Sequence, residues 1–238
     1  VPGEETAAIL AALAVGEQAR LSDRQWAVLR DTGTTHMVSI SGLHVSMVAL
    51  VLWLLVRRTL GCVPACQRAG PHLALVTGLL AATGYAVLAG WTVPTQRSVI
   101  MLACMVARRW RGHRLLDADG LLVALALVLL LDPLAALTGS FWLSFGAMGV
   151  LLVLGAVQRG GSAVGVWWGA HVWLAVLLLP LLVLVSPRLA WTSPLANSLL
   201  VPPVTWGVVP MVLAGIALAP WWPRGAEACW RGAGELWG

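Results

Sequence analysis

Imidazole and hydroxyl side chains crowd the start of the first long apolar run of this chain. The residues that carry them are His36, Ser39, Ser41, His44 and Ser46, and Gly42 lies among them. Such groups can move protons, pair as nucleophile and base, or line a water-filled path. On a straight helix, Ser41 and His44 lie opposite Ser39, so one set would face lipid. We therefore predict that the chain unwinds at Ser41–Gly42 and that both sets face one aqueous space.

A second polar cluster opens the third apolar run. Pro94 suits the first turn of a helix, and Thr95, Gln96, Arg97 and Ser98 follow it. Arg97 then lies about one turn inside the membrane, where an ionised guanidinium costs roughly 2.5 to 3.5 kcal/mol at the centre and less near the surface. Two interpretations stay open: the side chain extends to the outer headgroups, or it is a fixed cation beside a path for anions. The neighbouring hydroxyl and amide groups favour the second.

Later apolar runs contain further polar residues and helix breakers. These are Asp132, Pro133, Ser144, Gly146, Asn197 and Pro202. Aspartate before proline is typical of a helix cap. Gly146 predicts close helix packing, and the amide of Asn197 could bind backbone groups that Pro202 leaves open.

The sequence predicts neither a metal site nor a cofactor nor a catalytic centre. No carboxylate or cysteine lies at ligand spacing from the histidines, and the four cysteines are scattered. An intramembrane serine protease using Ser41 and His44 is disfavoured. Those two residues are three apart on one element, whereas a nucleophile and its base usually come from separate elements.

The elements that position these residues follow from composition. The 238 residues are 59% hydrophobic and 11% charged, against about 25% charged in a soluble domain. The fold class is therefore all-α: a polytopic transmembrane helix bundle of about six to eight spans, including broken or re-entrant helices. Seven apolar runs are candidate spans; they are 37–56, 73–89, 94–107, 121–131, 141–157, 164–185 and 195–219. We expect three regions: amphipathic lead-in helices at the outer surface (1–35), a membrane domain (36–222) and a short cytoplasmic tail (223–238).

Arginine placement orients the chain. All 15 basic residues are arginine. If the first span starts outside, ten of them fall in inside loops or the tail, whereas Arg188 is alone in the outside loops. This bias predicts an odd number of crossings, with the amino terminus outside and the carboxyl terminus cytoplasmic.

Five motifs follow one another along nearly the whole chain. They are His36-x-x-x-Ile40-Ser41-Gly42-Leu43-His44-Val45, Val93-Pro94-Thr95-Gln96-Arg97, Asp132-Pro133-Leu134-Ala135, Gly139-x-Phe141-Trp142-Leu143-Ser144-Phe145-Gly146-Ala147 and Ser193-Pro194-Leu195-Ala196-Asn197. In this order they resemble the ComEC family of competence DNA-translocation channels. The resemblance implies a bacterial inner-membrane channel that carries single-stranded DNA into the cytoplasm during natural transformation.

The resemblance also implies site residues and partners. The residues carried over as pathway or packing positions are His36, Ser41, Gly42, His44, Arg97, Asp132, Ser144 and Asn197. The implied partners are the DNA strand, membrane lipid, a DNA receptor with its uptake machinery, a second copy of the chain, and OB-like and nuclease domains outside this segment. The metal signature of such nucleases does not occur in these residues, so we expect a non-enzymatic segment of a longer protein. A secondary transporter for a small solute is the alternative, because broken spans also suit that class.

Overall fold

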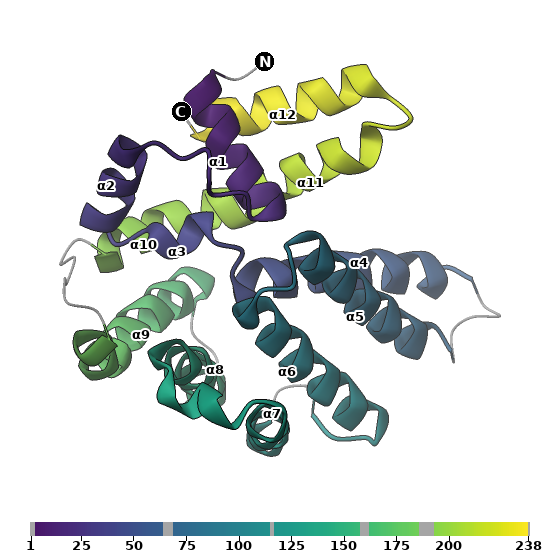
Figure 1. Cartoon of the computed structure of the whole chain (residues 1–238). Helices are drawn as coiled ribbons and strands as arrows, with labels where there is room; N and C mark the ends of the chain where they lie inside the picture. Colours follow the sequence, from purple (N-terminus) through teal and green to yellow (C-terminus); the bar gives the residue numbers. More distant parts are fainter. Residues whose placement is uncertain (1–2, 64–68, 115–116, 158–161, 186–192, 238) are drawn as a thin grey trace. The chain divides into compact units, whose positions relative to one another are not determined.

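The structure is a computed structural model that describes residues 3–63, 69–114, 117–157, 162–185 and 193–237. These residues form helices and no strands, so the all-α prediction is confirmed (Figure 1). The chain divides into two compact units. One comprises Val1–His44 and Leu189–Gly238, and the other comprises Val45–Arg188.

The first unit joins the two ends of the sequence. Its elements are α1 (Glu4–Val15), α2 (Asp23–Asp31), α3 (Thr35–Val38), α10 (Ser193–Pro203), the π-helical turn η3 (Val204–Val208), α11 (Val209–Leu218) and α12 (Pro223–Trp237). Helix α1 contacts both α11 and α12, and its buried side includes Ile9 and Leu13. Helix α2 begins at a capping box in which the Ser22 hydroxyl accepts the Gln25 amide, and the Gln25 side chain donates to the Glu5 carbonyl at 2.9 Å. The amino-terminal hairpin is thereby held against itself and against the carboxyl-terminal helices.

Two prolines explain the turn in the last span. Pro202 and Pro203 close α10, and the chain continues through η3 into α11. Because proline has no N–H, it cannot donate to the carbonyl one turn earlier, and the ladder of hydrogen bonds shifts.

The elements of the second unit are α4 (Gly42–Gly61, whose first turn belongs to the first unit), α5 (Gly70–Leu88), α6 (Val93–Trp110), α7 (Ala118–Leu131), the 3-10 helix η2 (Pro133–Leu137), α8 (Gly139–Val157) and α9 (Ala163–Val185). In this unit, helices that follow one another along the chain contact each other from α5 to α9. Gly78 lets α5 approach α4, since a Cβ there would lie 2.8 Å from the Ala49 carbonyl oxygen. A Cβ at Gly146 would lie 3.1 Å from Leu178 Cδ2, so this glycine lets α8 approach α9. Between α6, α7 and α8 the core contains Cys104, Val128, Phe141 and Phe145, among others.

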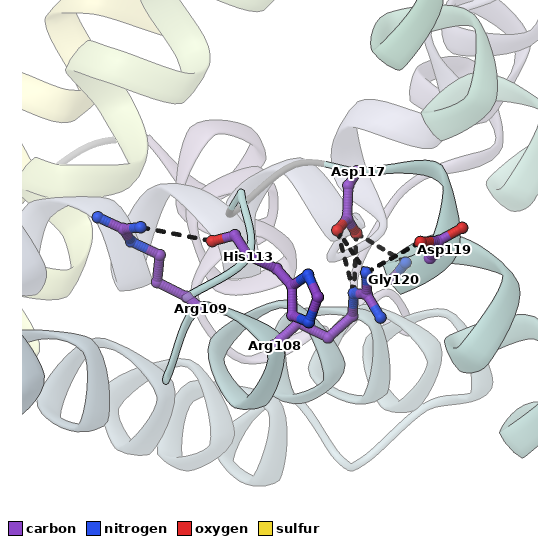
Figure 2. Close-up of polar contacts among 6 residues, drawn as sticks. All are labelled: Arg108, Arg109, His113, Asp117, Asp119 and Gly120. Carbon is purple, nitrogen blue, oxygen red and sulfur yellow. Dashed lines mark hydrogen bonds and ion pairs between the residues drawn. The ribbon is translucent and has the colours of Figure 1, made fainter. Parts of the chain in front are cut away.

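A polar cluster closes the hairpin between α6 and α7 (Figure 2). The Arg108 guanidinium donates to both carboxylate oxygens of Asp117, with 2.7 Å from Nη2 to Oδ2, and also pairs with Asp119 at 3.1 Å. Asp117 also caps α7 by accepting the Gly120 amide at 2.7 Å. The hydrogen bond from Arg108 lowers the pKa of the Asp117 carboxyl below its usual range. A loop rich in arginine is thus anchored by one carboxylate.

The helices correspond to the predicted spans. Four of those described are long and apolar enough to cross a membrane, namely Gly42–Gly61, Gly70–Leu88, Gly139–Val157 and Leu195–Leu218, and Ala118–Leu131 and Gly165–Leu181 are shorter apolar helices. The predicted polytopic bundle is confirmed, and the chain is a multi-pass membrane protein. The first span starts later than predicted, at Gly42 instead of Met37, because α3 ends at Val38 and Ser39 is extended. Of the arginines used to orient the chain, Arg68, Arg159 and Arg188 lie outside the described residues.

Candidate functional site

Arg97 is a buried cation on the second turn of α6. Only 2% of its surface is exposed, so it does not extend outward to headgroups. Its Nη2 donates to Ser140 Oγ at 3.1 Å. Ser140 lies at the start of α8, 43 residues away along the chain. The guanidinium is therefore fixed inside the second unit, between α6 and α8.

The acceptor on α8 is itself oriented by neighbouring hydroxyl groups. Ser140 Oγ donates to Thr138 Oγ1 at 3.5 Å, and Thr138 Oγ1 donates to the Ala135 carbonyl at 2.7 Å. Because each hydroxyl hydrogen is directed along this chain, a lone pair of Ser140 stays available to Arg97. The network runs from η2 to the guanidinium.

Two donor atoms of this guanidinium have no partner among the described residues. Arg97 Nε and Nη1 are buried and donate no hydrogen bond there. An unpaired buried donor costs about 1–3 kcal/mol, and more when charged. An oxyanion or water would remove this cost, so the site has the chemistry of an anion contact.

An open cleft adjoins Arg97 between α6, α7 and η2. Its lining includes Gln96 and Ile100 of α6, Val128 of α7, and Asp132. Asp132 is exposed, and its Oδ1 accepts the Leu134 amide at 3.1 Å as the cap of η2. A cation and a carboxylate thus share one cleft. In the described part of the chain they form no ion pair within 4.0 Å.

The histidine and serine segment belongs to the first unit. The chain is not helical from Ser39 to Ser41, which places the break where the helical wheel predicted it. His44 is buried, and its Nδ1 accepts the Ser41 amide at 3.5 Å. Ser41 directly precedes α4 and His44 is its third residue, so the ring takes the place that glutamate or glutamine has in a capping box. The contact uses the Ser41 backbone and not its hydroxyl, which gives no support to a nucleophile–base pair.

The other predicted site residues lie on helices, except Ser39, which is extended after α3. His36 is exposed on α3, and Ser39 Oγ donates to its carbonyl at 3.0 Å. Ser46 is exposed on α4, and Asn197 is half-buried on α10. Hydroxyl groups of α6 and α8 bond back to their own helices, from Ser98 to the Pro94 carbonyl at 2.9 Å and from Ser144 to the Ser140 carbonyl at 3.0 Å.

The structure brings together only part of the predicted set. Arg97 and Asp132 line one cleft, and Ser41 contacts His44. Sequence reasoning missed Ser140 as a partner of Arg97. Its signal was weak: a serine beside Gly139 before an aromatic run, where helix starts commonly place serine. Among the described residues, no three histidine, cysteine or acidic side chains are grouped as a metal site would need.

Comparison with known proteins establishes the family. The profile of the family described as Competence protein matches residues 13–237. This chain belongs to that competence protein family. The ComEC-type resemblance of the five motifs is thereby confirmed.

Named relatives agree with this assignment. Competence protein ComA of Neisseria gonorrhoeae is 42% identical over 92% of this chain and 32% of its own length. Uncharacterized protein YcaI of Escherichia coli K12 is 30% identical over 89% of this chain and 29% of its own. Recombination protein 2 of Haemophilus influenzae is 35% identical over 61% of this chain and 18% of its own. This competence domain thus spans about a third or less of these relatives, and no solved structure matches it.

Proposed function

We propose that this competence domain forms part of the wall of a channel that carries single-stranded DNA into the cytoplasm during natural transformation. Its membrane is the bacterial inner membrane, with the amino terminus outside. The family and the names of two relatives support a role in competence and DNA uptake. The step from that role to a conduit rests on the chemistry of the membrane-embedded cation.

Arg97 carries the proposal. It is a buried guanidinium within an apolar bundle, with one hydrogen bond to Ser140 and two further donors unpaired among the described residues. A phosphodiester presents two unesterified oxygens in the spacing of a guanidinium fork. Nε and Nη1 lie on different edges of the guanidinium, with Cδ between them, so a DNA phosphate would accept from one of these two edges at a time.

Asp132 at the same cleft favours release of a bound phosphate over tight retention. A channel must attract its cargo enough to admit it and weakly enough to release it. A carboxylate opposite the cation weakens the hold on any one phosphate, so that the next can replace it. DNA is a polyanion and needs more positive charges along its path than Arg97 alone. In this proposal they come from the domains outside this segment or from a second copy of the chain.

The small-solute transporter remains the competing proposal, supported by the break at Ser39–Ser41 and the turn after Pro203. One experiment in whole cells separates the two. Competent cells that lack the full-length protein receive labelled duplex DNA, and the label is partitioned between outside and cytoplasm. We expect binding outside with no strand in the cytoplasm, restored by the full-length protein. Normal entry of DNA into cells that lack the protein would favour the transporter, provided that membrane vesicles from those cells have lost an ion-coupled solute uptake.

A further inference from the structure

Helix α12 runs back along the last apolar segment. Trp230 Nε1 donates to the Val212 carbonyl at 3.3 Å, and the indole ring covers Gly215, where a Cβ has no room. Further along α12, Leu236 Cδ1 lies 3.3 Å from the Cβ position of Gly207. Residue numbers rise on α12 as they fall on α11 and η3, so the two are antiparallel (Figure 1). Gly207 lies midway along Leu195–Leu218, so α12 reaches back to about the middle of that span.

The two sides of α12 differ in kind. The side against its neighbours is made of small residues, of which Gly225, Ala226 and Ala233 are buried. The opposite side is exposed and charged along its whole length. We name it the α12 stripe; it consists of Arg224, Glu227, Arg231 and Glu235. These residues are three or four positions apart, so they form one row on the helix.

Lipid cannot be what covers this row. A charged side chain at the centre of the hydrocarbon costs roughly 2.5 to 3.5 kcal/mol on insertion scales, and charged residues in membranes turn toward water-filled cavities or partners. Arg231 and Glu235 lie on the part of α12 that runs beside the carboxyl-terminal half of the apolar segment Leu195–Leu218. Their stripe points away from α11, which fills the other side of the helix.

We infer that α12 is a re-entrant helix and that the α12 stripe lines the water-filled passage through which the DNA strand moves. This inference rests on the proposed function for the identity of the cargo, though not for the wet face. Arg224 and Arg231 offer phosphates two stations about 10 Å apart, at 1.5 Å of rise per residue. Glu227 and Glu235 alternate with them and keep each station from holding a phosphate tightly.

Cysteine labelling tests the wet face. Glu227→Cys, Arg231→Cys and Glu235→Cys are made singly in the full-length protein with Cys229→Ala, which removes the native thiol of α12 and serves as the blank. Trp206→Cys is the matched control, because Trp206 is 52% exposed beside Gly207, at the depth of Leu236. Labelling by a membrane-impermeant cationic methanethiosulfonate is followed in permeabilised cells, with immunoblots for protein amount.

We expect the stripe thiols to react at least about tenfold faster than Trp206→Cys, since a thiol in an apolar environment has a raised pKa and little thiolate. Stripe thiols that react no faster than the blank would overturn the inference. So would equal labelling of Trp206→Cys, which would mean that the segment beside α12 is itself in water. Neither result depends on DNA.

A second arm tests the cargo. Competent cells take up DNA whose trailing end carries streptavidin, which leaves a strand stalled in the channel. We expect the stalled strand to slow the labelling of Arg231→Cys severalfold compared with cells given no DNA. Unchanged labelling, in cells where stalled DNA is recovered with the protein, would exclude the stripe from the path while leaving the proposed channel intact.

Discussion

Replacing Arg97 by alanine separates a pathway cation from a structural one. The substitution removes the hydrogen bond to Ser140, but it also removes two buried donors that have no partner among the described residues. The lost bond is worth about 1.5–3 kcal/mol, and each unpaired donor costs about 1–3 kcal/mol, so the folded protein should lose little stability. If a phosphate accepts from one of those donors during transit, the same roughly 1.5–3 kcal/mol appears as an added barrier in the Arg97→Ala variant. That is about a 10- to 150-fold slower entry of DNA.

The assay counts labelled strand in the cytoplasm of competent cells that carry full-length variants at equal amounts in the membrane. Arg97→Lys keeps the charge without the planar fork, so its uptake should be intermediate. Arg109→Ala is the matched control, because it removes an exposed arginine from the other end of the same helix. Uptake at the wild-type level by Arg97→Ala, with normal protein amounts, would refute the role of the guanidinium. An equal loss in Arg109→Ala would mean that general charge, and not the buried site, is responsible.

Three further predictions concern stability, read as the melting temperature of the purified full-length protein in detergent. Gly215→Leu should lower the melting temperature, because the Trp230 ring fills the space beside Gly215 and overpacking costs about 1–3 kcal/mol. Gly155→Leu is the control, since a Cβ at Gly155 meets nothing within 4 Å. An equal loss in the control would contradict the packing argument. Asp117→Asn should destabilise the α6–α7 hairpin at neutral pH. The pKa of Asp117 in the folded protein is lowered by its arginine partner. Its contribution to the stability of the folded protein is therefore complete above about pH 4, the unfolded value, and disappears as the pH falls through the folded pKa. A stability difference from wild type that persists below the folded pKa would show another cause. His44→Gln should melt near wild type, since an amide can accept the same backbone N–H, whereas His44→Leu should lose about 0.5–2 kcal/mol; equal behaviour of the two would rule out the cap.

The elements of this fold could be predicted because their signals are local. Apolar run length predicted a helix at each of the seven candidate spans, of which four are long and apolar enough to cross a membrane, and Ser22 with Gln25 predicted the capping box of α2. The break before α4 followed from polar residues on both sides of a helical wheel. Its position was predicted, but its use was not: His44 caps a helix through its ring, a role that depends on where Ser41 places its amide.

Packing between distant segments could not be predicted in the same way. Arg97 stood out as a buried charge, but whether it extends to headgroups or into the protein depends on Ser140, which lies 43 residues away. The prediction of a short tail at residues 223–238 rests on the polarity that Arg224, Glu227, Arg231 and Glu235 give the segment, and it did not include the packing of α12. The small residues on the other side of α12, which pack against α11 and α1, carry little hydropathy.

The sequence by itself determined three things: that this chain is a membrane protein, which residues form its helices, and which family it resembles. It could do so because hydropathy, the length of apolar runs and the order of motifs are local properties of the sequence. Only the tertiary structure decided which polar groups meet: the guanidinium with the α8 serine, the imidazole with a backbone amide, and a charged helix with the middle of an apolar span. The physical reason is that a hydrogen bond or a close glycine contact depends on distances of a few ångströms between segments far apart in sequence, and those distances arise only when the helices pack.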